Sequence, residues 1–345
     1  KDIETSSPSW KTRIIYRGDM PLVVSGKTAD NKNTYSLVAE NEDVWTNTAA
    51  DHCGVRITLV AALVHRMFLY TCDLASAYLQ AEAGGREVYI RISRNLRGSL
   101  PDDIHAELDV VDSPVVHLRR ALYGRKRSGL DWSRKLHSTL MEMGFQKCSS
   151  INGIYYHVNA AGVVDIILAC YVDDCVVGIS SHRAEAFFTD LGSRVRIKPN
   201  ADGSIGWNRC TRFLGIEYEA RIGAAHAQAI IQMDAFVLHA ITKFEEKFGH
   251  LRPTTRLPDV SPPALERSTK GHEFRSPIAV LLWLARCLRA DIYRCVGDFT
   301  CVVEYWRPIE HLQELKKLMA VVKTTMDLKM CLKISYRDFK LSRAR

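Results

Sequence analysis

The stretch LACYVDDCVVG, residues 168–178, places two adjacent carboxylates, Asp173 and Asp174, inside an apolar run. The residues on both sides are mostly apolar or β-branched, which is typical of short strands. The pattern therefore predicts a tight hairpin with the acids at its turn. Aspartate is an ordinary turn residue, because it tolerates turn geometry and bonds its own backbone. Adjacent carboxylates also repel each other and resist ionising together, so a bound cation would explain the pair better than turn chemistry alone.

A third carboxylate lies one hundred residues earlier. The stretch TCDLASAYLQ, residues 71–80, places Asp73 at the end of an apolar strand predicted for residues 68–74. By itself, Asp73 is better explained as the N-cap of a short helix. Taken with the Asp-Asp pair, it indicates three carboxylates on two separate strands that converge on divalent cations. Mg²⁺ prefers oxygen ligands, and two such ions stabilise the attacking and leaving oxygens of a phosphoryl displacement.

The composition indicates the size of the core, the charge of suitable partners and the state of the cysteines. The chain has 345 residues, 47% of them hydrophobic, which is enough for a sizeable core and two subdomains. A net charge of +8 is compatible with a polyanionic partner without demonstrating one. The ten cysteines include no CxxC pair and favour buried free thiols in a reducing compartment over disulfides or a zinc site. No apolar stretch is long enough to predict a membrane span.

The order of predicted elements is mixed at first and helical later. Residues 10–26 and 87–92 are expected to form strands, and residues 27–48 and 95–114 to form loops. The expected helices cover residues 51–67, 129–143, 182–192, 232–248, 276–289 and 308–326. Residues 253–272 are rich in proline and charge and predict a linker. The chain is therefore expected to be an α+β protein.

Several motifs resemble one family of polymerases. The YVDD stretch and DLASAYL resemble motifs C and A of a reverse transcriptase, and the surrounding detail resembles the copia-type retrotransposon family. Further segments resemble that family in the correct order, from about residue 10 to about residue 333: WKTRIIYRGD at 10–19, VVHLRRALYGRKRSGLDW at 115–132, RFLGIEYEA at 212–220, IIQMDAFVLHAITKF at 230–244, and residues 274–332. Each segment is weak evidence alone, whereas all of them together in the correct order are specific.

The resemblance implies a right-hand polymerase fold with fingers, a palm built on an antiparallel sheet, and a helical thumb. Residues 1–50 would be a partial fingers domain, 51–220 the palm with fingers elements, and 221–345 a helical thumb and connection region without RNase H. The implied enzyme is a nucleotidyltransferase, an RNA-directed DNA polymerase that joins a dNTP to a primer 3′-OH by a two-metal mechanism. Its implied partners are an RNA or DNA template with primer, dNTPs, and RNase H and integrase domains of a polyprotein that lie outside this chain. No membrane partner is expected, and localisation would be cytoplasmic, in particles, with the nucleus as a second compartment.

The resemblance also implies roles for individual residues. The catalytic and metal-binding residues would be Asp73, Asp173 and Asp174, with the carbonyl of Leu74, holding two Mg²⁺ or Mn²⁺ ions. The nucleotide would be bound by Lys11, Arg13, Tyr78 and Arg127. The nucleic acid would be bound by Lys126, Tyr171, Val172, Phe213, Leu214 and Gly215. Tyr78 is equally compatible with a packed core position, and Arg13 with an exposed strand edge.

Departures from the family pattern keep other hypotheses open. Arg127 replaces a glutamine of the nucleotide pocket, Gly129 replaces a proline, and Ala290 replaces another proline. Arginine still binds phosphate, although its shape and charge differ from those of glutamine. The alternative is a degenerate retroelement relic that binds nucleic acid without polymerising. A scaffold protein with an accidental Asp-Asp pair is a third and weaker hypothesis.

Overall fold

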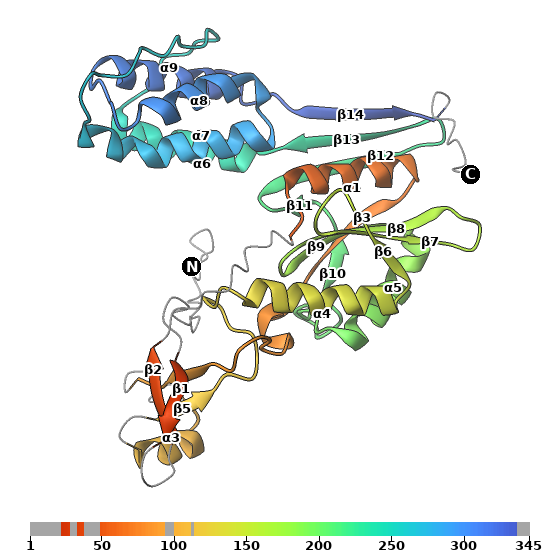
Figure 1. Cartoon of the computed structure of the whole chain (residues 1–345). Coiled ribbons are helices and arrows are strands. Elements are labelled where there is room, and N and C mark those ends of the chain that lie inside the picture. The colour runs from red at the N-terminus through yellow and green to blue at the C-terminus, as the bar shows by residue number, and fades with distance from the viewer. Residues whose placement is uncertain (1–21, 28–32, 38–48, 94–99, 112–113, 337–345) are drawn as a thin grey trace. The chain divides into compact units, whose positions relative to one another are not determined.

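The structure is a computed structural model that describes residues 22–27, 33–37, 49–93, 100–111 and 114–336 (Figure 1). It is a mixed helix and sheet protein, as the sequence predicted. The chain divides into two compact units, one of residues 1–58 and 70–208 and the other of residues 59–69 and 209–345. Each unit is described by itself.

The first unit is built on a six-stranded sheet with the order β10-β3-β9-β8-β7-β6. Its strands are β3 (Phe68–Asp73), β6 (Phe145–Lys147), β7 (Ile154–Val158), β8 (Val164–Tyr171), β9 (Asp174–Ile179) and β10 (Trp207–Arg209). Strands β6 to β9 are antiparallel neighbours in chain order. Residues 166–170 of β8 are all buried, so both faces of this strand are covered. That burial explains why the strand is a continuous apolar run without alternation.

Three helices agree with the predicted ones: α1 (His52–Val64), whose residues from Leu59 on belong to the second unit, α4 (Ser128–Glu142) and α5 (Ser181–Arg194). The short 3₁₀ helix η1 (Ala77–Gln80) was not among the expected helices. Helix α4 buries Trp132, Leu136 and Leu140, which lie four residues apart on one face. The helix ends just before Gly144, whose φ of 83° is favourable for glycine.

A smaller antiparallel sheet in the same unit corrects two loop predictions. Its order is β2-β1-β4-β5, formed by β1 (Leu22–Lys27), β2 (Asn33–Leu37), β4 (Tyr89–Arg91) and β5 (Val115–His117). Strand β2 lies in the stretch expected to be a loop, and helix α3 (Asp102–Asp109) lies in another. Helix α3 follows Pro101 and carries Asp102 and Asp103 in its first turn, where carboxylates favour the positive end of the helix dipole. The aspartates of residues 95–114 favour loops in general, but at the start of a helix they stabilise its first turn.

The second unit combines a four-stranded antiparallel sheet with helices. The sheet has the order β11-β12-β13-β14, formed by β11 (Arg212–Phe213), β12 (Ile216–Ile222), β13 (His226–Gln232) and β14 (Met330–Ser335). Strands β13 and β14 therefore lie within residues 221–345, the region expected to be a helical thumb and connection. Strand β13 alternates buried Ala227, Ala229 and Ile231 with more exposed residues, the two-residue period of a strand.

The helices of this unit are α6 (Asp234–Phe248), η2 (Thr269–Phe274), α7 (Arg275–Cys287), η3 (Ala290–Ile292), α8 (Tyr293–Val302) and α9 (Glu310–Thr324). Stacked rings join them, with Phe274 4.4 Å from Trp306 and 5.2 Å from Phe248 between ring centroids. The predicted linker has no regular structure over residues 251–268, but hydrogen bonds from Ser261 to Glu314 fix it to α9. Within the described ranges, no helix has both the length and the apolar character to cross a membrane.

Candidate active site

The Asp-Asp pair lies at a two-residue hairpin turn between β8 and β9. Tyr171 pairs with Asp174, so Val172 and Asp173 are the two central residues of the turn. This confirms the hairpin that the sequence predicted. Val172 has a φ of 60°, a value that glycine adopts readily and a β-branched residue rarely does. Such a conformation costs about 1–3 kcal/mol and persists only where the surroundings hold it.

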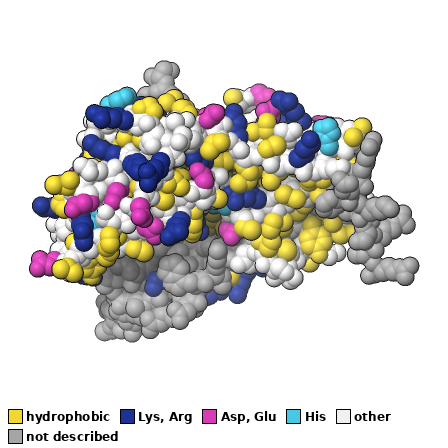
Figure 2. Space-filling model, turned by 90° about the horizontal axis from the view of Figure 1, so that it is seen from above, with side chains coloured by type: hydrophobic (Ala, Val, Ile, Leu, Met, Phe, Trp, Pro, Cys, Tyr) yellow, Lys and Arg dark blue, Asp and Glu magenta, His cyan; other side chains and the backbone are white. Residues whose placement is uncertain are grey.

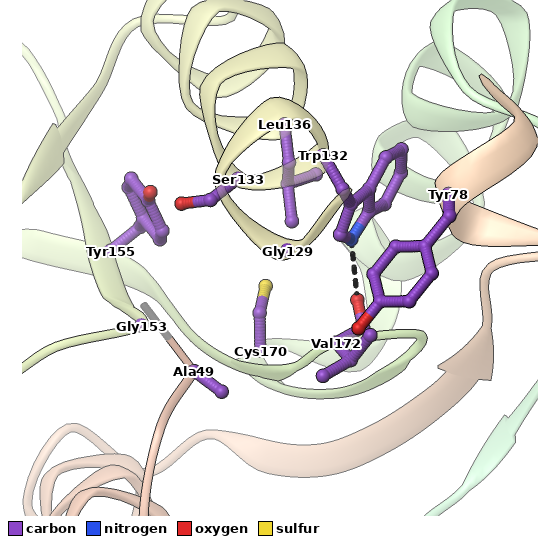
Figure 3. Close-up of a pocket in the computed structure, with 10 residues that line it drawn as sticks. All are labelled: Ala49, Tyr78, Gly129, Trp132, Ser133, Leu136, Gly153, Tyr155, Cys170 and Val172. Atoms are coloured by element: carbon purple, nitrogen blue, oxygen red, sulfur yellow. Dashed lines mark hydrogen bonds between the residues drawn. The ribbon is translucent and has the colours of Figure 1, made fainter. Parts of the chain in front are cut away.

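Two hydrogen bonds hold this turn from outside. The indole Nε1 of buried Trp132 on α4 donates to the carbonyl oxygen of Val172 at 2.7 Å (Figure 3). The backbone N–H of Leu74 donates to the carbonyl oxygen of Asp173, also at 2.7 Å. The turn is therefore tied to α4 on one side and to the end of β3 on the other.

The same arrangement brings Asp73 close to the Asp-Asp turn. Asp73 is the last residue of β3, and β3 is the neighbour of β9, whose first residue is Asp174. Burial raises the pKa of Asp174 to about 6, and the negative charges of Asp173 and Asp73 add to the rise. The positive charge of Lys198 opposes it. Three mutually repelling carboxylates at the end of two adjacent strands form a site that favours a cation.

Lys198 is a site residue that the sequence analysis missed. Its Nζ lies 3.5 Å from Oδ2 of Asp73, and its backbone N–H donates to the carbonyl oxygen of Asp73 at 2.8 Å. An antiparallel bridge between Leu74 and Ile197 produces this pairing. A lone lysine after α5 carries no recognisable signal, because only strand pairing brings it to the carboxylates.

The donor chemistry of the site fits a hard divalent cation, since carboxylate oxygens are the ligands such ions prefer. Among the residues that the structure describes, however, no three His, Cys, Asp or Glu side chains are arranged to hold one metal ion together. Mg²⁺ commonly takes only one or two protein carboxylates and completes its shell with water and substrate phosphates. These carboxylates would therefore supply only part of a coordination shell, and the remaining ligands would have to come from water and substrate.

Tyr78 lies beside the Asp-Asp turn. It belongs to η1, which follows Ser76 at a φ of 51°, and its ring centroid is 4.7 Å from that of Tyr123. Burial raises the pKa of Tyr78, and Tyr123, Asp173 and Tyr171 add to the rise. Figure 3 shows its ring at one wall of a small cavity that Trp132 and Val172 also line. The structure thus brings Tyr78 to the same cavity wall as Val172 of the turn, while its predicted role in nucleotide binding stays a prediction.

Arg127 occupies a structural position within the chain. Its Nε donates to Oδ1 of buried Asp131 at 3.0 Å, and Asp131 also accepts a hydrogen bond from the N–H of Gly84. A Cβ at Gly85 would lie 2.9 Å from a guanidinium nitrogen of Arg127, so the arginine packs directly on the glycine backbone. Arg127, which was predicted to bind the nucleotide, is therefore hydrogen-bonded to Asp131 in this structure.

The remaining predicted residues are distributed as follows. Lys11 and Arg13 lie outside the described residues. Tyr171 is 43% exposed beside Asp174, and Lys126 is exposed just before α4. Phe213, Leu214 and Gly215 belong to the second unit, at the turn between β11 and β12. The structure thus gathers the three aspartates, Leu74, Tyr78, Tyr171 and Val172 in the first unit.

Three thiols lie directly behind the carboxylates. Cys72 precedes Asp73, Cys170 precedes Tyr171, and Cys175 follows Asp174, and all three are buried. Hydrogen bonding to Cys175 and burial raise the pKa of the Cys72 thiol well above its ordinary value. A hydrogen bond to Cys170, together with burial, does the same for the pKa of Cys175. All ten cysteines are free, as predicted, although Cys53, Cys301 and Cys331 are exposed.

Comparison with known proteins agrees with the motifs. A family model described as Reverse transcriptase (RNA-dependent DNA polymerase) matches residues 27–250, which is 224 of the 345 residues. Among solved structures, telomerase from Candida albicans in complex with a fragment of telomeric RNA is similar at 12% identity and a TM-score of 0.29. That match covers 84% of this chain and 51% of the telomerase chain, so the protein spans about half the length of that relative. The family match covers most of the chain and includes all three aspartates, and the protein is therefore a member of the copia-type reverse transcriptase family.

Proposed function

We propose that the protein is an RNA-directed DNA polymerase that transfers a nucleotide from a dNTP to a primer 3′-OH. One observation carries the proposal. Asp73, at the end of β3, lies beside the turn that carries Asp173 and Asp174, and burial together with the negative charges of Asp173 and Asp73 raises the pKa of Asp174 to about 6. This arrangement occurs inside the segment that the reverse transcriptase family matches.

In this proposal the three aspartates hold two Mg²⁺ or Mn²⁺ ions, and the carbonyl of Leu74 contributes a further oxygen. When bound, such ions neutralise phosphate charge and favour ionisation of the attacking hydroxyl. The protein itself would hold the carboxylate oxygens in a fixed position. Trp132 and Leu74 fix the backbone of the turn, so that Asp173 and Asp174 present their oxygens without rearrangement.

Aromatic residues would position the substrates. Tyr78 lies against Tyr123 beside the turn, where its ring would support the sugar of the incoming nucleotide. Tyr171 is exposed next to Asp174, where it would contact the primer end. Phe213, Leu214 and Gly215 remain proposed contacts of the primer, and Lys11, Arg13 and Lys126 proposed contacts of phosphate.

The proposed macromolecular substrate is a template with an annealed primer, held chiefly through its phosphates. The net charge of +8 supports such a partner. On the face shown in Figure 2, lysine and arginine side chains are spread among acidic and apolar ones. The charge of this face does not form a single continuous patch, so binding there would depend on several separated contacts and fall steeply with added salt.

A second candidate is a protein that binds nucleic acid without extending a primer. The position of Arg127 supports it, because the family has glutamine here and this arginine is paired with Asp131. If the nucleotide pocket needs a free side chain at this position, dNTP binding would be lost while duplex binding continues.

Primer extension separates the two candidates. A poly(rA)/oligo(dT) duplex with dTTP and Mg²⁺ is given to the wild type, to Asp173→Asn, and to Asp298→Asn, an exposed aspartate on α8 in the second unit. The proposed polymerase extends the primer as wild type and as Asp298→Asn, and loses extension as Asp173→Asn. Salt-sensitive duplex binding without extension by the wild type, in Mg²⁺ or Mn²⁺, would favour the second candidate. Extension by Asp173→Asn at the wild-type rate would contradict the carboxylate mechanism.

A further inference from the structure

Two thiols next to the Asp-Asp turn lie close enough together to form a disulfide. Cys170 on β8 and Cys175 on β9 form a cross-strand pair, one step from the pair Tyr171 and Asp174. Their sulfur atoms lie 3.4 Å apart, and both side chains are buried. Directly opposed residues in antiparallel strands have Cα atoms about 4.5–5.5 Å apart, which is within the range that a disulfide spans. A bond between these sulfurs therefore needs no movement of the strands past each other.

Cys170 is also reachable from a cavity. Its thiol points into the space of about 30 Å³ lined by Tyr78, Trp132, Tyr155 and Val172, among others (Figure 3). One water needs about 10–15 Å³ of such space, so this volume accommodates a molecule of two oxygen atoms such as hydrogen peroxide. A small oxidant can therefore approach Cys170 first, since Cys175 does not line this cavity.

The backbone of Cys170 is held in place while its side chain faces the cavity. Its N–H donates to the carbonyl oxygen of Gly153 at 2.9 Å, and its own carbonyl oxygen accepts from the N–H of Ala50 at 2.7 Å. These bonds keep the Cys170 sulfur at the cavity wall and close to the Cys175 sulfur.

We infer that Cys170 and Cys175 form an oxidisable dithiol, a modification site for small peroxides that closes a disulfide behind the catalytic turn. The Cys170 sulfur attacks one oxygen of hydrogen peroxide, the O–O bond breaks, and a sulfenic acid and one water result. The Cys175 sulfur then attacks the Cys170 sulfur and displaces the hydroxyl, which takes the thiol proton and leaves as a second water. Two thiols and one peroxide thus become one disulfide and two waters.

Closure would affect the site proposed above, and this consequence rests on the proposed function. A disulfide brings the sulfurs to about 2.05 Å, a contraction of more than 1 Å immediately behind Tyr171 and Asp174. Displacements of about 1 Å near a reacting centre can lower rates by about 100-fold. We expect oxidation to lower primer extension by at least about 10-fold, and a dithiol reductant to restore it.

The test uses the full chain with Cys53, Cys301 and Cys331 replaced by serine, so that exposed thiols do not link different molecules. The protein is treated with hydrogen peroxide, free thiols are alkylated under denaturing conditions, and the chain is cut on the amino side of aspartates. This cleavage places Cys170 in peptide 165–172 and Cys175 in peptide 174–189, so a disulfide between them joins two separate peptides. Cys175→Ala and Cys170→Ala serve as matched controls, and Cys287→Ala removes a buried thiol in the second unit.

The expected result is a joined pair of these peptides in the parent and in Cys287→Ala, and its absence in both matched controls. Alkylation of both thiols after peroxide treatment, or a link from Cys175 to Cys72, would overturn the inference. Peptide mapping needs no polymerase activity, so an inactive reduced protein would count against the proposed function and leave the dithiol result intact.

Discussion

Two hairpins of this chain turn through two residues and place a branched side chain at positive φ. In the first unit the turn is Val172 and Asp173, with Val172 at 60°. In the second unit it is Leu214 and Gly215, at 49° and 80°. Only the second turn has positive φ at both central residues, which matches the twist of the flanking strands, and glycine at its second position adopts this conformation without strain.

The two turns differ in how their positive-φ conformation is stabilised. The Leu214 turn has its own glycine, whereas the Val172 turn is held by Trp132 on α4 and by Leu74 at the end of β3. The Val172 turn also carries two carboxylates that repel each other. The Val172 turn thus combines a strained backbone, two hydrogen bonds that hold it from outside, and carboxylates that repel each other. Strain maintained in this way is typical of functional sites, and a bound cation would offset the repulsion.

The largest expected effect comes from removing a charge at the Val172 turn. Asp174→Asn should lower nucleotide incorporation by about 1000-fold or more, because it removes an oxygen ligand and its charge. The same change should raise the midpoint of urea unfolding, since Asp174 no longer repels Asp73 and Asp173. Single-nucleotide incorporation and urea unfolding are both measured, with Asp298→Asn as control. Loss of activity together with lower stability would indicate misfolding, and would contradict the account of repelling carboxylates.

The next effect comes from removing the external support. Trp132→Phe keeps a buried ring but removes the N–H that bonds Val172, which should lower the unfolding free energy by about 1–3 kcal/mol. We expect incorporation to fall by about 10-fold, chiefly in the rate of the chemical step. Trp207→Phe is the matched control, since Trp207 stacks on Phe188 in the same unit. Equal losses of incorporation in the two variants would show that Trp132 contributes only packing.

A smaller effect is expected in the pH dependence of stability without divalent metal. The pKa of Asp174 in the folded protein is about 6, above its ordinary value of 3.8, so the folded state binds more protons between these values. The unfolding free energy contributed by this group is therefore highest below pH 4 and falls as pH rises to about 6. Urea unfolding at several pH values should show this fall in the wild type and a smaller one in Asp174→Asn. Identical profiles would mean that Asp174 is not the group responsible.

The smallest effect is expected at the second turn. Leu214→Asn places an Asn-Gly pair in a turn that favours it, and should raise the unfolding free energy by about 0.5 kcal/mol. Val172→Asn should not give the same gain, because its strain is already offset by Trp132 and Leu74. Equal stabilisation of both variants, measured by urea unfolding, would remove the distinction between the two turns.

Much of the site was predictable because its signal is local. The hairpin at Asp173, the strand before Asp73 and the helix that carries Trp132 follow from short apolar patterns and turn residues. The support of the turn was not predictable, because Trp132 reaches Val172 across 40 residues. Lys198 reaches Asp73 only through strand pairing. The pairing of Arg127 with Asp131 was missed because the family pattern places a glutamine there, although the four-residue spacing on a helix was visible.

The secondary structure differed from the prediction where the local composition favoured another kind of element. Strand β13 comes just before α6 and β14 just after α9, and small residues such as Ala227 and Ala229 weaken the hydrophobic alternation of β13. Helix α3 was not predicted because aspartates are common both in loops and at the start of helices.

The central claim is that the three aspartates act together on divalent cations. The most direct measurement is Mn²⁺ binding, followed by the electron paramagnetic resonance of free Mn²⁺, in the presence of dTTP and a poly(rA) template with a primer that lacks a 3′-OH. The account predicts that wild type and Asp298→Asn bind Mn²⁺ beyond the amount bound by the substrates alone, and that Asp73→Asn and Asp173→Asn each lose that excess. Equal Mn²⁺ binding by all four proteins would contradict it.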